Sequence, residues 1–209
     1  GDLMINGPVF WDGGTFNSAA STNLAGGVTL DTTATKTIST TLTNSGGMLQ
    51  TDGKLAISVV SSLENDANFI IDRSTTNDID GAGIINNNAS GTITKNNGGT
   101  STIRNVINNA GTIDIVNGTI DFLDDTTTSG TGSFMIGAAG TVGFAGGNTH
   151  TFTNINPFSG SAGALISITN GSAMLDCNAA VAIPGTIDLT MTGGTLAGVA
   201  VALRERNKD

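Results

Sequence analysis

The chain is poor in the residues from which catalytic and metal sites are usually built. Its 209 residues include one histidine, His150, one cysteine, Cys177, and no tyrosine. A single cysteine excludes an intramolecular disulfide and any metal site made of several cysteines. No apolar run approaches the roughly 18 residues that a membrane-spanning helix requires, so we expect no membrane span.

Basic residues are scarce as well. Eight Lys and Arg residues against 17 Asp and Glu residues give a formal net charge of −9 at pH 7. Binding to the phosphates of a nucleic acid needs clustered cations, so we expect no nucleic-acid partner. Arg204, Arg206 and Lys208 fall in the last six positions, and this predicts a charged, solvated end over residues 202–209.

The abundant residues favour short strands and tight turns. The chain has 30 glycines, is rich in Thr and Asn, and is 38% hydrophobic. Threonine is β-branched and suits a pleated surface, whereas Gly and Asn suit tight corners. The hydrophobic fraction is sufficient for a buried core, and no amphipathic helical window is visible. These features predict an all-β fold.

One corner dipeptide repeats along the chain. A Gly-Thr pair begins at Gly14, Gly91, Gly99, Gly111, Gly118, Gly130, Gly140, Gly185 and Gly194. The corners fall in pairs, Gly91 with Gly99, Gly111 with Gly118 and Gly130 with Gly140, which indicates a unit of about 20 residues with two or more strands. Apolar residues alternate with polar ones between corners, as in GTIDIVNGTIDF from Gly111, with the isoleucines expected inside.

Stacking of such units predicts a parallel β-helix, or β-solenoid, of about ten coils. A β-sandwich is the alternative, since it also has short strands separated by frequent turns. We expect less regular coils or a cap over residues 1–63, a repeat body over 64–201, and the charged end over 202–209. The asparagine clusters at 86–88, 96–97 and 108–109 are expected at corners, where stacked side chains would form hydrogen-bonded ladders.

Three features suggest chemistry, and a plain structural role is the preferred interpretation of each. His150 with Cys177 would make a nucleophile pair only if the fold joined them; we expect a surface strand histidine and a buried thiol. Asp78 and Asp80 resemble the start of a calcium loop but lack its later ligands. Asp124-Asp125 resembles the paired acids of glycosidases. We therefore predict no catalytic residue, no metal ligand and no cofactor.

The stretches NNAGTIDIVNGTIDF from Asn108 and GTVGFAGGNTHTFTN from Gly140 resemble repeats of filamentous-haemagglutinin-like adhesins and autotransporter passengers. The resemblance covers residues 81–201 and implies a right-handed parallel β-helix on a bacterial surface. It suggests a secreted or cell-surface structural or adhesive segment that forms a stiff rod or extracellular filament. The expected partners are other copies, through the end coils, and a cell-surface or glycan ligand. A polysaccharide-degrading β-helix enzyme and a phage tail-fibre segment are the alternatives.

Overall fold

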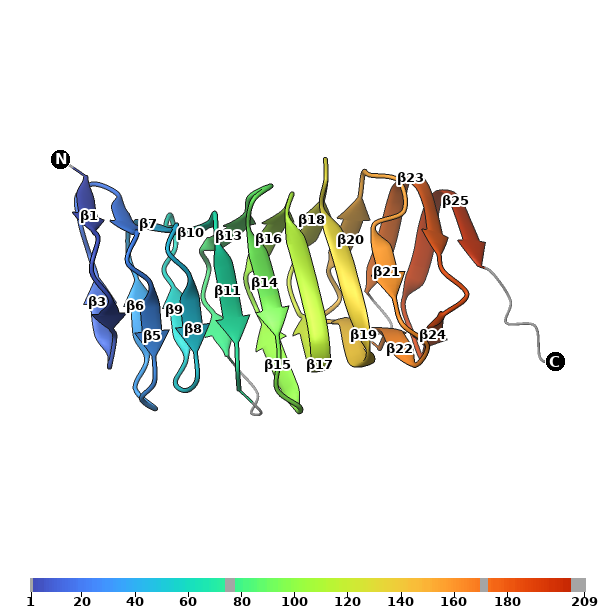
Figure 1. Cartoon of the computed structure of the whole chain (residues 1–209). Coiled ribbons are helices and arrows are strands. Elements are labelled where there is room, and N and C mark those ends of the chain that lie inside the picture. Colours follow the sequence, from blue (N-terminus) through green and yellow to red (C-terminus); the bar gives the residue numbers. More distant parts are fainter. Residues whose placement is uncertain (1, 74–77, 170–172, 204–209) are drawn as a thin grey trace.

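The chain winds into a β-solenoid of about nine turns, as the computed structural model shows (Figure 1). The structure describes residues 2–73, 78–169 and 173–203, and none of these residues is helical. Successive coils lie side by side along one axis, and most coils contribute one short strand to each of three faces.

The first face is a ten-stranded sheet. Its strands, in spatial order, are β1 (Leu3–Ile5), β4 (Thr22–Leu24), β7 (Thr41–Asn44), β10 (Ser62–Asn65), β13 (Ile84–Asn87), β16 (Val106–Asn109), β18 (Thr126–Thr128), β20 (Thr149–Phe152), β23 (Met174–Ile183) and β25 (Thr195–Leu203).

The second and third faces form one continuous sheet, because β17 (Thr112–Phe122) and β19 (Ser133–Phe144) run round the corner from one face to the other. The second face also contains β2 (Val9–Phe10), β5 (Val28–Leu30), β8 (Met48–Gln50), β11 (Asn68–Ile71), β14 (Thr92–Lys95) and β21 (Phe158–Gly160). The third face also contains β3 (Gly14–Phe16), β6 (Lys36–Ile38), β9 (Leu55–Ile57), β12 (Ile79–Asp80), β15 (Thr100–Ile103), β22 (Ala164–Ile168) and β24 (Ile187–Met191).

Strand pairing confirms the solenoid and excludes the sandwich. Within the described residues, neighbouring strands run parallel, as in the pairings of β10 with β7 and with β13, whereas a sandwich is built from antiparallel sheets. Asn65, Asn87 and Asn109 occupy equivalent positions 22 residues apart. A coil of 22 residues, longer than the 20 predicted, explains about nine turns in place of ten.

The interior is filled by the alternate residues that the sequence pattern places inside. Ile113, Ile115 and Ile120 are fully buried, and Phe122 is 1% exposed. The intervening Asp114 is half-buried on the outside. Five phenylalanines form a cluster in the C-terminal half, with ring centroids 5.1 to 6.5 Å apart: Phe122, Phe134, Phe144, Phe152 and Phe158.

Stacked glycines mark the corner between the first and second faces. A Cβ atom on Gly91 would lie 2.1 Å from the Asn65 carbonyl oxygen, and one on Gly111 would lie 2.2 Å from the Gly91 oxygen. The coils therefore approach too closely for any side chain here. The next member of this set is Gly132, which meets the Asn109 oxygen at 2.2 Å. The sequence pattern suggested Gly130 as the corner glycine, but Gly130 lies two residues earlier, and a Cβ atom there would meet no atom within 4 Å.

The two sheets continue through the predicted boundary at Leu63, since residues 1–63 contribute β1 to β9 and pair with the coils that follow. Of the predicted charged end, residues 204–209 lie outside the described residues. Among the residues that are described, no helix has the length and apolar character needed to cross a membrane.

Candidate functional site

An asparagine ladder runs inside the solenoid at the last residue of four first-face strands. The side-chain Nδ2 of Asn44 donates to Asn65 Oδ1, Asn65 donates to Asn87, and Asn87 donates to Asn109, each at 2.7 Å. All four side chains are fully buried. Asn65 and Asn87 also donate to the Thr92 and Thr112 carbonyls in the next coil. The predicted ladder is therefore confirmed at Asn87 and Asn109.

A second row of polar side chains lies on the outer surface of the first face. Asn86 Nδ2 donates to Glu64 Oε1 at 2.7 Å, and Asn108 Nδ2 donates to Asn86 Oδ1 at 2.9 Å. Register extends this row in both directions, and we call it the outer polar row: Asn23, Thr43, Glu64, Asn86, Asn108, Thr127, Thr151 and Asp176. The remaining asparagines of the predicted clusters do not form asparagine ladders, because Asn88 donates a hydrogen bond to Asp66 and the pair at 96–97 is exposed.

A buried charge cluster fills the corner between the second and third faces. Lys36 and Lys95 are fully buried, and their ammonium groups donate to the backbone carbonyls of Thr32 and Arg73 respectively. Arg73 lies 3.2 Å from the buried carboxylate of Asp78. Burial lowers the pKa of both lysines and raises that of Asp78. Opposite charges and carbonyl oxygens thus compensate several cations in one place.

Sequence reasoning missed this cluster although a signal was present. In Thr92–Lys95 the inward Ile93 and Lys95 are two positions apart, so strict alternation already places the lysine inside. Lys36 stands in the same relation to Ile38. General preference puts lysine outside, and the alternation does not show which carbonyl oxygens receive the ammonium group.

Asp78 and Asp80 do not converge on one ligand. The Asp78 carboxylate points inward to Arg73, whereas Asp80 Oδ2 accepts a hydrogen bond from Lys54 Nζ at 2.6 Å on the outside. The Lys54 bond is the main cause of the lowered pKa of Asp80. Residues two apart on a strand would face the same way, but Asp78 lies just before β12 (Ile79–Asp80) and is outside that alternation. No group of three His, Cys, Asp or Glu side chains suited to a metal occurs among the described residues.

His150 lies in the core, so the expected surface position is wrong. Its side chain is fully buried, and its ring centroid is 4.8 Å from that of Phe144. Burial lowers its pKa to about 4. Cys177 is buried as expected, and burial raises the pKa of its thiol. His150 lies on β20 opposite Leu175 of β23, and Cys177 lies on β23 opposite Phe152 of β20, so the two groups are on neighbouring strands but two positions out of register. A neutral histidine and a protonated thiol suit a core.

The Asp124-Asp125 pair is engaged in turn hydrogen bonds. Asp124 Oδ1 accepts the Asp125 backbone N–H at 2.8 Å, and Asp125 Oδ1 accepts the Thr149 N–H of the next coil at 2.9 Å. Each carboxylate therefore stabilises the corner between β17 and β18.

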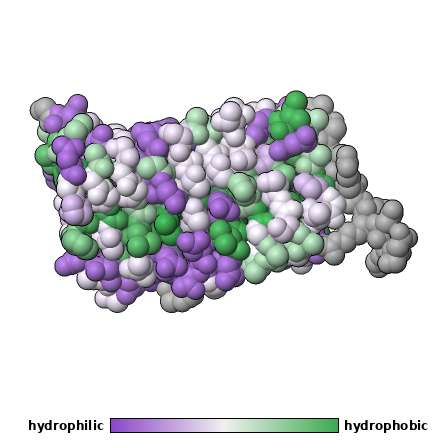
Figure 2. Space-filling model, viewed as in Figure 1, coloured by the Kyte–Doolittle hydropathy of each residue, from purple (hydrophilic) through white to green (hydrophobic). Residues whose placement is uncertain are grey.

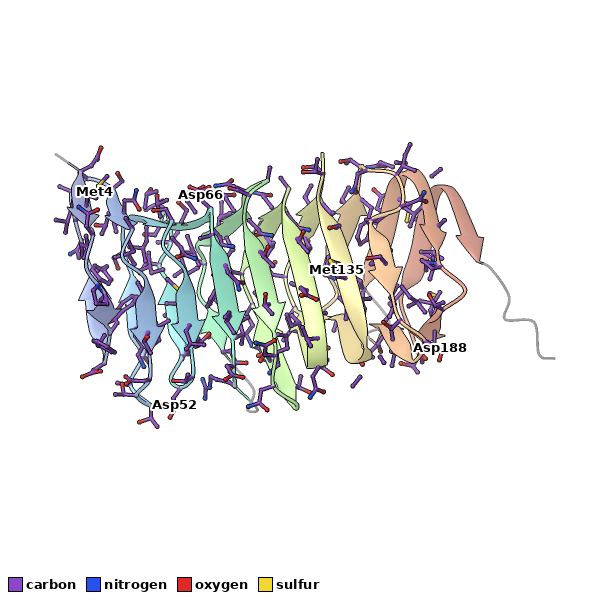
Figure 3. All side chains as sticks on the ribbon, in the orientation of Figure 1. Met4, Asp52, Asp66, Met135 and Asp188 are labelled. Atoms are coloured by element: carbon purple, nitrogen blue, oxygen red, sulfur yellow. The ribbon has the colours of Figure 1, made fainter. Side chains whose placement is uncertain are left out.

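The surface carries shallow hollows on the second face. One of about 300 Å³ is lined by Thr29, Leu49, Ile70 and stacked glycines. Figure 2 shows apolar side chains gathered as a band over β5, β8 and β11, where this hollow lies. Another, of about 370 Å³, includes Met135, which is half-exposed and labelled in Figure 3. Asp52 and Asp66, labelled in the same view, lie between strands, whereas Asp188 lies on β24.

Comparison of the chain with protein-family models, with curated proteins and with solved structures gives no match. The fold and the groups described above are therefore the basis for a proposed function.

Proposed function

We propose that the chain is a structural or adhesive segment of a secreted or cell-surface bacterial protein and builds a stiff rod or extracellular filament. The observation that carries this proposal is the continuous first face, in which ten strands from successive coils pair around one interior. Each coil adds one strand spacing of about 4.8 Å along the axis, and its backbone hydrogen bonds point along that axis to the coils on either side. Bending such a stack requires the bonds on one face to lengthen together.

The interior adds to this stiffness. The asparagine ladder joins four successive coils by buried 2.7 Å hydrogen bonds, and buried hydrogen bonds are costly to break without a replacement partner. The resemblance to filamentous-haemagglutinin-like adhesins and autotransporter passengers supports the same role and a surface location.

An adhesive role would use the outer polar row. Its amides, hydroxyls and carboxylates stand at the strand spacing along the first face. The amides and hydroxyls both donate and accept hydrogen bonds and the carboxylates accept them, which is the chemistry that recognises the hydroxyls of a glycan. The expected ligand is therefore an extended surface polysaccharide rather than an anion, because the chain is acidic.

Adhesion is tested with beads coated with the purified chain and exposed to immobilised glycans and to host cells. The triple variant Asn86→Ala, Asn108→Ala, Thr127→Ala removes the centre of the outer polar row and leaves the core intact. We expect native beads to adhere and variant beads to detach. Equal adhesion of native and variant beads would show that the outer polar row is not the adhesive surface. Release of sugar products by the native chain would favour the polysaccharide-degrading enzyme.

Filament building makes a separate prediction, because end coils of one molecule would stack on those of another. Light scattering on the purified chain should show particle mass rising with concentration. A constant monomer mass over a wide range would reject self-association while leaving the adhesive role to be judged by the bead assay.

A further inference from the structure

Strand pairing on the second face stops at β21. Every second-face strand from β5 to the first half of β19 has a neighbour on each side, whereas β21 pairs with β19 alone. The chain nevertheless makes a further coil. Its residues 180–183, at the end of β23, pair with β25 and not with β21. The register shift between Cys177 and Ala180 accompanies this divergence. A strand edge is therefore left open within the body of the solenoid.

The backbone groups on this edge follow from parallel geometry. The Phe134 N–H donates to the Pro157 carbonyl, and the Ser161 N–H donates to the Ile136 carbonyl. In a parallel ladder alternate residues point both backbone groups to the same side, so Ser159 faces β19 and Phe158 and Gly160 face the open edge. The Thr186 hydroxyl donates to the Gly160 carbonyl at 2.9 Å, and no strand pairs with this edge in the described part of the chain.

A hollow of about 410 Å³ lies against the same edge. It is lined by Asn156, Phe158, Ala182, Ile183, Pro184, Gly185 and Thr186. None of these residues is charged, and the inner wall consists of Phe158 and Ile183, each 4% exposed. An apolar, uncharged wall beside backbone donors and acceptors is complementary to an extended polypeptide with apolar side chains.

Two features prevent the chain from closing this hollow by itself. The Ala182 N–H, which would reach β21 in a regular coil, donates instead to Asn156 Oδ1 at 3.2 Å. Pro184 has no N–H to donate. Asn156 adopts a positive φ of 53°, the left-handed region that Asn tolerates. The side chain of Asn156 thus holds residues 180–183 away from the edge of β21.

We propose that the open edge of β21 is an acceptor site for an extended, apolar segment of another polypeptide, which adds to the second face as a strand. The existing series β14, β17, β19 and β21 sets the spacing and hydrogen-bond pattern that the incoming strand continues. Main-chain hydrogen bonds supply affinity and the hollow selects a bulky apolar side chain. This site is independent of the rod's proposed adhesive role.

The test uses a fluorescein-labelled peptide with the sequence TIDIV of residues 112–116, a strand that this face already accommodates. The matched control peptide is N-methylated at alternate residues, which removes the backbone donors but keeps the side chains. We expect anisotropy to show saturable binding of TIDIV and at least tenfold weaker binding of the control. Amide exchange should slow at Phe158 and Gly160 when the peptide is added.

Protein variants locate the site. Ala182→Trp fills the hollow and should weaken TIDIV binding at least tenfold, whereas Thr29→Trp, in the hollow near β5 and β8, should leave it unchanged. Equal binding of both peptides, no binding up to about 1 mM, or protection of amides elsewhere would overturn the proposal. Dimerisation of the chain that Ala182→Trp abolishes would identify a second copy as the occupant, which also overturns the proposal.

Discussion

Replacement of Asn87 by alanine tests the inner ladder, the feature that joins coils through side chains. Asn87 accepts a hydrogen bond from Asn65 and donates two, to Asn109 Oδ1 and to the Thr112 carbonyl, with distances of 2.7 to 3.0 Å. A net contribution of about 1 kcal/mol for each bond gives a loss of about 3 kcal/mol. The cost rises further because the truncated side chain is fully buried and leaves a cavity.

Asn86 provides a matched control one residue away. Asn86 also forms two hydrogen bonds with its neighbours in the outer polar row, Glu64 and Asn108, but on the outer surface, where water replaces a lost partner. Asn86→Ala should cost less than about 1 kcal/mol. Urea unfolding followed by circular dichroism measures both, with the midpoint shift converted through a common slope. A loss for Asn87→Ala no larger than that for Asn86→Ala would refute the view that the buried ladder stabilises the stack.

Three further perturbations follow from the buried groups. The pKa of His150 is about 4 in the folded chain, below its ordinary value of 6.5, so the unfolded chain takes up the proton first and stability falls as pH drops from 6.5 towards 4. Between pH 7 and pH 5 the His150→Leu variant should therefore lose about 2 kcal/mol less stability than the native chain. Equal losses for the two proteins in urea titrations would contradict this. Asp78→Leu removes the buried carboxylate opposite Arg73, which keeps its contacts with Asp52 and the Gly53 carbonyl, and should cost about 3 kcal/mol. Asp80→Ala breaks a partly exposed pair with Lys54 and should cost under about 1 kcal/mol. Thermal unfolding compares the two variants, and a calcium-dependent rise in the native melting temperature would support the calcium loop instead. Phe134→Ala opens the centre of the phenylalanine cluster and should cost about 3 to 5 kcal/mol; a midpoint close to the native one would show that the cluster is loosely packed.

Local patterns carry most of the fold. Alternation in GTIDIVNGTIDF predicts which isoleucines are buried. The recurring Gly-Thr corners predict stacked coils, because at Gly91 and Gly111 the backbone of the preceding coil leaves no room for a side chain. The number of coils depends on the lengths of the turns, which the corner dipeptide does not determine. Because the coils have 22 residues and not 20, the solenoid has about nine turns in place of the predicted ten.

Side-chain environments were harder to predict than strands. His150 is buried although its neighbours Thr149 and Thr151 look like a surface, since a Thr-rich strand still turns every second residue inward. Lys36 donates to the Thr32 carbonyl four residues earlier and to the Asp52 carbonyl 16 residues later, whereas Lys95 donates to the Arg73 carbonyl 22 residues earlier. The open edge at β21 accompanies a register shift in β23, which the alternation of apolar residues does not predict.

The central claim, a stiff stack of coils whose outer polar row keeps one register, is tested most directly by spin-label distances along that row. In a Cys177→Ala background, labels at Asn23 and Asn108 are four coils apart and labels at Asn23 and Thr151 are six coils apart. At about 4.8 Å per coil, we predict narrow distributions near 19 Å and 29 Å, subject to a common label offset, and a difference of about 10 Å between them. Broad distributions, or a second distance no longer than the first, would contradict the account.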